Sequence, residues 1–195
     1  MSHGTAAPPA FARFPAYCHA TLLIGGAEGE CSRVQPELDY RRAVEPLEVR
    51  LDRLEAEAAI VRLKAQYSRC CDDGYDADGI AALFVPDGVW DGGDLFGRAE
   101  GVAAIRAHFA QAAARIPWAL HFTLNPIIDV DLAGRSATGT WYLWQPCIRQ
   151  RSSGPSQSWL AGTYDDVYEL TGDGWRFRSV VVRARWLEGP PESLS

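Results

Sequence analysis

The chain has 195 residues, of which 47% are hydrophobic and 23% charged, and its formal net charge is −6. This composition is typical of one globular domain with its own core, and it excludes a collagen-like, coiled-coil or wholly disordered chain. The 25 acidic residues outnumber the 19 basic ones and no basic run occurs. We therefore expect neither nucleic acid nor an anionic membrane as a partner.

Patterning divides the chain into three parts. Residues 1–45 are rich in Ala, Pro and Gly without sustained periodicity, which predicts an irregular N-terminal extension. Residues 46–188 are patterned throughout and are predicted to form the domain, and residues 189–195 are left as a tail. The apolar run at 20–24 is too short for a membrane span, and the five cysteines contain no Cys-x-x-Cys pair. These features predict a cytoplasmic protein.

Helices are predicted in the first half of the domain. One long amphipathic helix starts at Pro46 and ends near Gly74, because apolar residues recur at spacings of three and four on two adjoining stripes, at 47, 51, 54, 58 and 61 and at 60, 63, 67 and 71. Asp76 can cap a second, short helix that runs to Phe84. A strand starts at Val89, and a third helix is predicted over about 99–115.

Strands are predicted in the second half, where the period changes to two. Four strand-like segments cover about 118–130, 136–149, 157–170 and 175–186 and are separated by turn residues. Helices followed by antiparallel hairpins are typical of the α+β class. Because strands of this length must twist and curl, we expect a curved sheet with helices on its concave face, open at one end.

Motifs for common cofactor chemistry are missing from the sequence. It contains no glycine-rich dinucleotide motif, phosphate loop, Gly-x-Ser-x-Gly elbow or His-Glu-x-x-His pair. Its four histidines, at 3, 19, 108 and 121, do not form a cluster with cysteines. We expect no cofactor and no metal, and we place His108 on the surface of the third helix.

His121 is the candidate base. Strand alternation sends Leu120, Phe122 and Leu124 to one face and Ala119, His121, Thr123 and Asn125 to the other. The alternative to a functional face is a hydrogen-bonded histidine on a solvated strand face.

Asp72 lies at the end of the first helix, where the helix dipole disfavours a carboxylate unless another group holds it. An imidazole could hold it, and a carboxylate on one ring nitrogen leaves the other nitrogen free to remove a proton. The alternative is a solvated turn that also contains Asp73, Asp76 and Asp78.

Three segments together resemble the SnoaL-like branch of the nuclear transport factor 2 superfamily. They are Glu57 to Asp72, His121 to Asn125, and Leu160 to Tyr168 followed by Asp173-Gly-Trp175. The resemblance covers about 47–186. It implies a cone-shaped α+β domain in which a strongly curved antiparallel sheet packs on three helices and encloses a pocket.

The resemblance also implies roles for residues. In the lyases of this family an Asp late in the first helix and a His on the sheet form the catalytic dyad, and Asp72 and His121 fall on those positions. Tyr67 matches a tyrosine of the dehydratases. The family's hexachlorocyclohexane dehydrochlorinase has a lysine where this chain has Tyr67 and an arginine where it has Val180, which disfavours dehydrohalogenation.

The function expected from these points is a cofactor-independent lyase or isomerase, dehydratase-like, that acts on a small hydrophobic, cyclic substrate. His121, oriented by Asp72, would abstract a proton and Tyr67 would donate a hydrogen bond. The substrate-binding residues we expect are Trp90, Asn125, Trp141, Trp159 and Tyr164. The aromatic residues among them could instead belong to the core or to a dimer interface.

Alternatives of other classes stay open. One is a non-catalytic small-molecule-binding or assembly module of the same fold, and another is a subunit that only stabilises a partner enzyme.

For the protein itself we expect a homodimer or homotrimer that uses the outer face of the sheet, where Trp118, Leu120, Phe122 and Leu124 gather.

Overall fold

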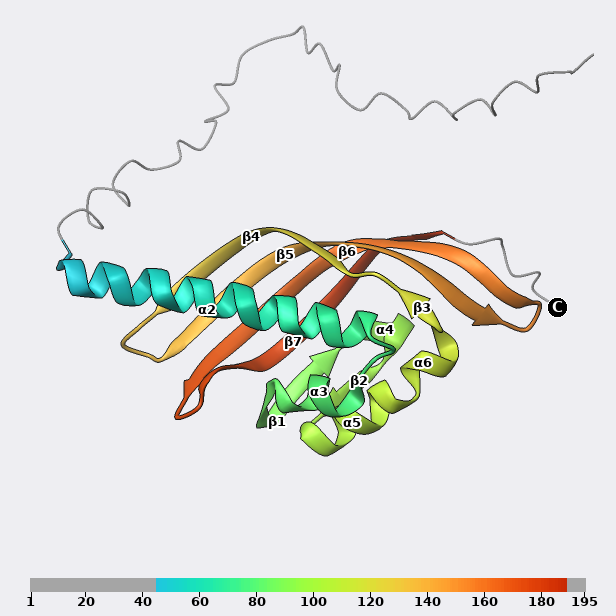
Figure 1. Ribbon diagram of the computed structural model, residues 1–195, viewed down its shortest axis with the longest axis horizontal. Helices are drawn as coiled ribbons and strands as arrows, with labels where there is room; N and C mark the ends of the chain where they lie inside the picture. Colours follow the sequence, from blue (N-terminus) through green and yellow to red (C-terminus); the bar gives the residue numbers. More distant parts are fainter. Residues whose placement is uncertain (1–44, 189–195) are drawn as a thin grey trace, which may run out of the picture. The chain divides into compact units, whose positions relative to one another are not determined.

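The computed structural model describes residues 45–188 (Figure 1). The predicted extension, apart from Glu45, and the predicted tail lie outside the described residues. Within 45–188 no helix is long and apolar enough to cross a membrane.

Helix α2 (Leu47–Asp72) forms as predicted and runs along the concave side of the sheet (Figure 1). Its buried stripe is the one that contains Ile60, Leu63, Tyr67 and Cys71. In the other predicted stripe, the side chains of Leu47, Leu51 and Leu54 are exposed. Arg53 attaches the N-terminal half of α2 to the sheet, because its guanidinium donates a 2.9 Å hydrogen bond to the carbonyl of Val130.

The segment from 77 to 115 differs in detail from the prediction. Asp76 caps α3 (Ala77–Ala82) through a 3.0 Å bond from the Gly79 amide, as expected, but the helix stops before Phe84 because β1 (Phe84–Asp91) begins there. The predicted third helix starts at Val102 and is split at Gln111. The elements are α4 (Gly93–Phe96), β2 (Arg98–Glu100), α5 (Val102–Ala110) and α6 (Ala112–Arg115).

The second half is the predicted run of strands. The elements are β3 (Trp118–Ala119), β4 (Phe122–Asp131), β5 (Ser136–Arg151), β6 (Gly154–Thr171) and β7 (Gly174–Glu188). The sheet order is β2-β1-β7-β6-β5-β3, and β4 also pairs with β5. All pairs are antiparallel except β1 with β7, so the sheet is mixed. The α+β class and the curved sheet are confirmed.

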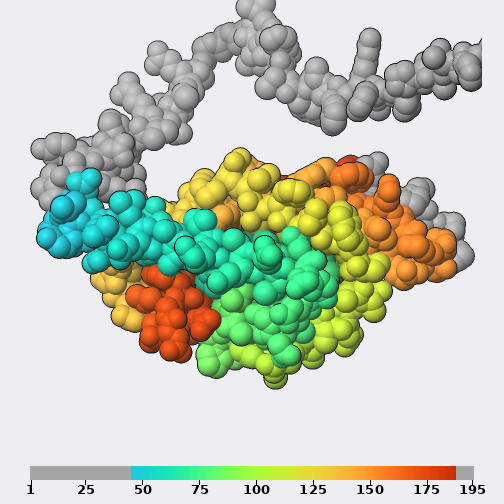
Figure 2. All heavy atoms as spheres, in the orientation of Figure 1, coloured from blue at the N-terminus to red at the C-terminus, as the bar shows by residue number. Residues whose placement is uncertain are grey.

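The core lies between α2 and the inner faces of β5, β6 and β7. Tyr67 packs edge-on against Tyr164 and Phe177, with ring centroids 6.1 and 5.6 Å apart. Each large apolar side chain buried here stabilises the fold by about 1.5–3 kcal/mol. Figure 2 shows α2 and the short helices covering the sheet in this view, while the tip of the β5–β6 hairpin extends past them.

The outer face of the sheet carries a group of exposed apolar side chains. Trp144 stacks between Trp159 and Trp186, at centroid distances of 5.6 and 6.1 Å. The exposed large apolar residues on and beside β3 and β4 include Trp118, Leu120, Phe122 and Leu124. The predicted alternation therefore turns these side chains outward and His121 inward.

Candidate active site

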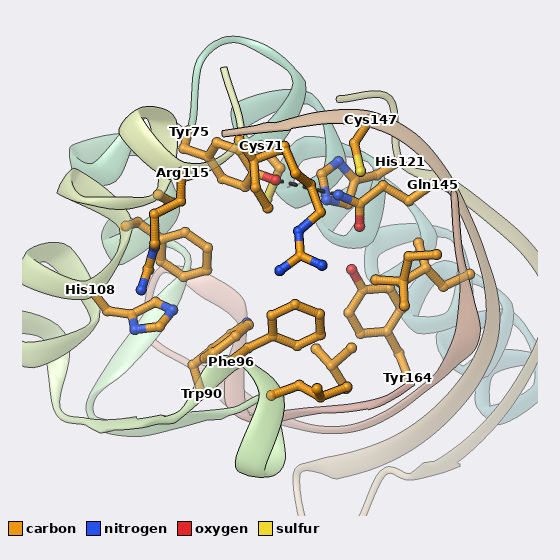
Figure 3. A pocket seen from close by; sticks show the side chains of 18 of the residues that line it. Cys71, Tyr75, Trp90, Phe96, His108, Arg115, His121, Gln145, Cys147 and Tyr164 are labelled. Carbon is orange, nitrogen blue, oxygen red and sulfur yellow. Dashed lines mark hydrogen bonds between the residues drawn. The ribbon is translucent and has the colours of Figure 1, made fainter. Parts of the chain in front are cut away.

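A cavity of about 120 Å³ lies between α2, α5, α6 and the inner faces of the sheet (Figure 3). Its floor is formed by the buried rings of Tyr67, Phe109 and Tyr164, and Leu95 and Arg115 lie at its exposed rim. Most of its lining is apolar or aromatic, with a few polar groups among them. Small-molecule sites in proteins usually have this composition.

His121 and Asp72 form a hydrogen-bonded pair at this cavity. Oδ1 of Asp72 lies 2.8 Å from Nδ1 of His121 and accepts a second bond, also 2.8 Å, from the His121 backbone N–H. Because a carboxylate can only accept, Nδ1 carries the donated hydrogen, and in the neutral imidazole Nε2 then carries none. The side chain of His121 is 5% exposed and that of Asp72 26%. The predicted geometry of the pair is confirmed.

Two segments far apart in the sequence position this pair: the end of α2 and the start of β4. Asp72 is the last residue of α2, where the dipole disfavours it, and its two bonds from His121 compensate. His121 lies in the link between β3 and β4, just before β4 begins at Phe122. Since β3 and β4 both pair with β5, the imidazole is held by two strands and one helix end.

Tyr67 lies in the cavity wall, one and a half turns before Asp72. Its phenol oxygen accepts a 2.9 Å bond from Nε1 of Trp90. Burial raises the pKa of Tyr67 well above its usual value, because a phenolate would be desolvated here. The phenol therefore stays protonated and can donate its own hydrogen. Trp90 and Tyr164 also line the cavity, as expected.

Two polar residues of the site were missed by the sequence analysis. Tyr75 follows Gly74 in a turn where both have positive φ, 57° and 67°, and its ring packs edge-on at 5.9 Å from that of His121. Gln145 donates a 3.4 Å bond to the Tyr75 hydroxyl (Figure 3). The pairs Ala119↔Cys147 and Phe122↔Trp144 place Gln145 opposite His121. The alternation Leu143, Gln145, Cys147 was the signal for this inward position.

His108 is not the surface residue that we predicted. It is half-buried, lines the cavity and packs on Trp90 with centroids 4.5 Å apart. Burial lowers its pKa, and the positive charge of Arg115 lowers it further. The alanines at 104 and 112 suggested a surface face; Ala104 is exposed, but Ala112 is buried and His108 contacts Trp90.

Three predicted substrate-binding residues lie outside this cavity. Asn125 is exposed with φ 49°, because an extra residue in β4 between Leu124 and Ile127 breaks the alternation. Trp141 is buried in the core, where its Nε1 donates 3.0 Å to the Tyr168 hydroxyl. Trp159 is 41% exposed on the outer face of β6.

A buried ion pair lies below the cavity. Lys64, the only lysine of the sequence, has its Nζ 2.8 Å from Oδ2 of Asp166, and both side chains are 0% exposed. Nζ also lies 3.3 Å from the centroid of the Tyr164 ring. The Tyr168 hydroxyl donates 2.8 Å to the same carboxylate. This group supports the ring that forms the cavity floor.

Within residues 45–188, no three His, Cys, Asp or Glu side chains cluster closely enough to hold a metal ion.

Comparison with known proteins gives one family. A family model described as the SnoaL-like domain matches residues 52–181. A search of curated proteins finds no significant match.

Solved structures share the fold at low identity. A candidate scytalone dehydratase from Novosphingobium aromaticivorans is 20% identical, covers 75% of this chain and 93% of its own, and has a TM-score of 0.62. A type 2 hexachlorocyclohexane dehydrochlorinase is 18% identical; the match covers 72% of this chain and 93% of the dehydrochlorinase chain, with a TM-score of 0.65. The type 3 hexachlorocyclohexane dehydrochlorinase from Novosphingobium barchaimii is 20% identical; the match covers 71% of this chain and 92% of the other, with a TM-score of 0.62.

Proposed function

The chain belongs to the SnoaL-like domain family, and we propose that it is a cofactor-independent lyase or isomerase for a small, largely hydrophobic organic substrate. The observation that carries this proposal is the His121–Asp72 pair, whose imidazole borders a mostly apolar cavity. A base with one nitrogen held and the other free, beside a space for a small molecule, is suited to proton abstraction.

The proposed reaction begins with proton transfer from carbon to Nε2 of His121. The carbon lies next to an electron-withdrawing group, so the electron pair of the broken C–H bond is delocalised as an enolate. Asp72 stabilises the imidazolium that forms. In dehydration the imidazolium returns the proton to the departing hydroxyl, which leaves as water. In isomerisation it returns the proton to another carbon.

Hydrogen-bond donors support this reaction from the cavity wall. The phenols of Tyr67 and Tyr75 stay protonated, since burial raises the pKa of each well above its ordinary value. A neutral phenol aimed at the enolate oxygen or at the departing hydroxyl stabilises developing negative charge. Two relatives of this fold are named for dehydratase and dehydrochlorinase activity. Of these two reactions we propose dehydration, because Tyr67 and Val180 differ from the residues expected in a dehydrochlorinase.

A substrate panel tests the proposal. The protein is incubated with cyclic ketones, hydroxyacyl compounds and polyketides, and products are identified by mass spectrometry. A loss of water, or a product of unchanged mass and new retention time, supports a lyase or an isomerase. Binding of panel members without any conversion would instead identify a non-catalytic binding module.

Replacing Tyr67 by phenylalanine is expected to lower kcat about 2- to 10-fold, because one neutral hydrogen bond is lost while the base remains. Trp90 would also lose its acceptor, so the melting temperature should fall. Trp90→Phe is the matched control, since it removes the same internal bond and keeps the phenol. Because Trp90 also lines the cavity, this control applies to the melting temperature. A wild-type kcat in Tyr67→Phe would show that the phenol takes no part in turnover.

We also propose that the protein is a homodimer or homotrimer that buries the outer face of its sheet. The stacked indoles of Trp144, Trp159 and Trp186 expose more apolar surface than a monomer usually leaves in water. Light scattering should give two or three times the chain mass of 21.4 kDa. Trp144→Lys should reduce this mass, whereas Leu54→Lys, at an exposed position of α2, should not. A wild-type mass near 21.4 kDa would contradict the proposal.

A further inference from the structure

The charged side chains that line the cavity directly carry one sign, while the Asp72 carboxylate lies behind His121. Two arginines, Arg115 and Arg149, line it, and no aspartate or glutamate does. The chain as a whole is acidic, with a net charge of −6, so the lining differs from the average surface. A cavity with two cations and apolar walls favours an anionic ligand, because charges attract more strongly where water is excluded.

Neither arginine has a partner within residues 45–188: no ion pair or side-chain hydrogen bond joins Arg115 or Arg149 to another described residue. Of the other arginines in residues 45–188, five pair with carboxylates at 2.5–3.0 Å, namely Arg53, Arg98, Arg106, Arg178 and Arg183. Others on the surface of this range, such as Arg50, Arg62 and Arg69, have no such pair, so what distinguishes Arg115 and Arg149 is their place in the cavity lining. Among residues 45–188 no carboxylate occupies the two cavity arginines, so they are available to the carboxylate of a ligand.

The fold places the two cations toward the open part of the cavity. Arg149 continues the inward alternation of β5 after Gln145 and Cys147, and it is half-buried where those two are buried. Burial raises the pKa of the Cys147 thiol in the cavity wall, and the positive charge of Arg149 acts against this shift. Arg115 is the last residue of α6 and is exposed. Figure 3 shows it beside His108, across the cavity from His121.

We propose that the substrate of this site is an organic anion, a carboxylate with an apolar cyclic body, anchored by Arg149 and Arg115. The planar guanidinium binds a carboxylate through two parallel N–H···O bonds. With the carboxylate at the arginines, the apolar body lies among Trp90, Phe109 and Tyr164 and extends toward His121. The small volume, about 120 Å³, favours one ring and a compact anion over a nucleotide or a coenzyme thioester.

This substrate class rests on the proposed function for the reaction, but binding can be measured without turnover. The test uses His121→Ala as the background, with calorimetry of benzoate, cyclohexanecarboxylate and trans-cinnamate, each against its neutral primary amide. The acids should bind at least about 10-fold more tightly than the amides, since hydrogen bonds between charged groups are roughly twice as strong as neutral ones.

Arginine variants then locate the anion. Arg149→Gln should remove most of the preference for acid over amide, about 10- to 100-fold, and Arg115→Gln should reduce it less, because that side chain is exposed. Arg149→Lys should keep part of it. Arg62→Gln, which removes the same charge from an exposed position of α2, is the control and should change nothing.

Two results would overturn the substrate class. One is equal affinity for acids and amides in the His121→Ala background. The other is a preference that persists unchanged in folded Arg149→Gln and Arg115→Gln. These failures differ from failure of the proposed function, in which the acids bind with the expected preference but no panel compound is converted by the wild-type protein.

Discussion

Replacing His121 by alanine is expected to lower turnover about 10²- to 10⁴-fold, the usual contribution of a positioned general base. Asp72→Asn should also remove most turnover. An asparagine amide at this position can present its N–H₂ group to Nδ1, which would leave Nε2 with the hydrogen and without its role as base. The measurement is kcat on the best substrate of the panel, with circular dichroism to confirm the fold.

The double variant His121→Ala/Asp72→Asn makes the test specific. Two residues that form one base have strongly non-additive effects, so the double variant should be about as slow as His121→Ala alone. Asp73→Asn is the matched control, since Asp73 follows directly in the chain and is exposed. Fully multiplicative effects of His121 and Asp72 would show that the two residues act separately.

Replacing Lys64 by methionine is expected to lower the free energy of unfolding by about 3–5 kcal/mol, because it leaves the Asp166 carboxylate buried with one cation fewer. Desolvation lowers the pKa of Lys64 and raises that of Asp166, whereas their mutual attraction acts against both shifts. Of the hydrogen bonds to Asp166, the one from Tyr168 would remain. Urea unfolding measures the effect.

The partner substitution separates pairing from packing. Lys64→Met/Asp166→Leu should recover part of the loss, because an apolar pair needs no desolvation of charge. Arg62→Met, an exposed position on the same helix, should change stability by no more than about 0.5 kcal/mol. A Lys64→Met protein as stable as the wild type would show that the pair does not stabilise the fold.

Local patterns predicted the dyad because each half of it has a short-range signal. Alternation around His121 separates apolar from polar residues, and Asp72 stands at a helix end that disfavours it. The same alternation gives a wrong prediction four residues later, at Asn125, which is exposed. At Asn125 the extra residue of β4 shifts the register, and strand alternation alone does not locate such a bulge.

Long-range packing decided what the patterns could not. Trp141 and Trp159 were grouped by residue type, yet Trp141 is held in the core by Tyr168 and Trp159 stacks outside on Trp144. Lys64 stands within the buried stripe of α2, between Leu63 and Tyr67, and its partner is 102 positions away in β6. A single lysine within an apolar helix stripe was the sequence feature that could have indicated a buried ion pair.

The cations at the cavity rim were missed for a similar reason. Arg149 lies near the end of β5, and only its alternation with Gln145 and Cys147 places it inside. Arg115 ends a four-residue helix that was predicted as part of a longer one.

If His121 removes a proton from carbon, the protein should exchange that proton with solvent, and solvent isotope incorporation measures this exchange most directly. The wild-type protein is incubated in D₂O with a cyclic ketone that carries a carboxylate, such as 4-oxocyclohexanecarboxylate, and with other substrates of the panel. Deuterium uptake next to the carbonyl is followed by NMR. We predict incorporation well above the rate without protein, abolished in His121→Ala and retained in Asp73→Asn. Incorporation at equal rates in wild type and His121→Ala, or none above background with any ligand that binds, would contradict the assignment of His121 as the base.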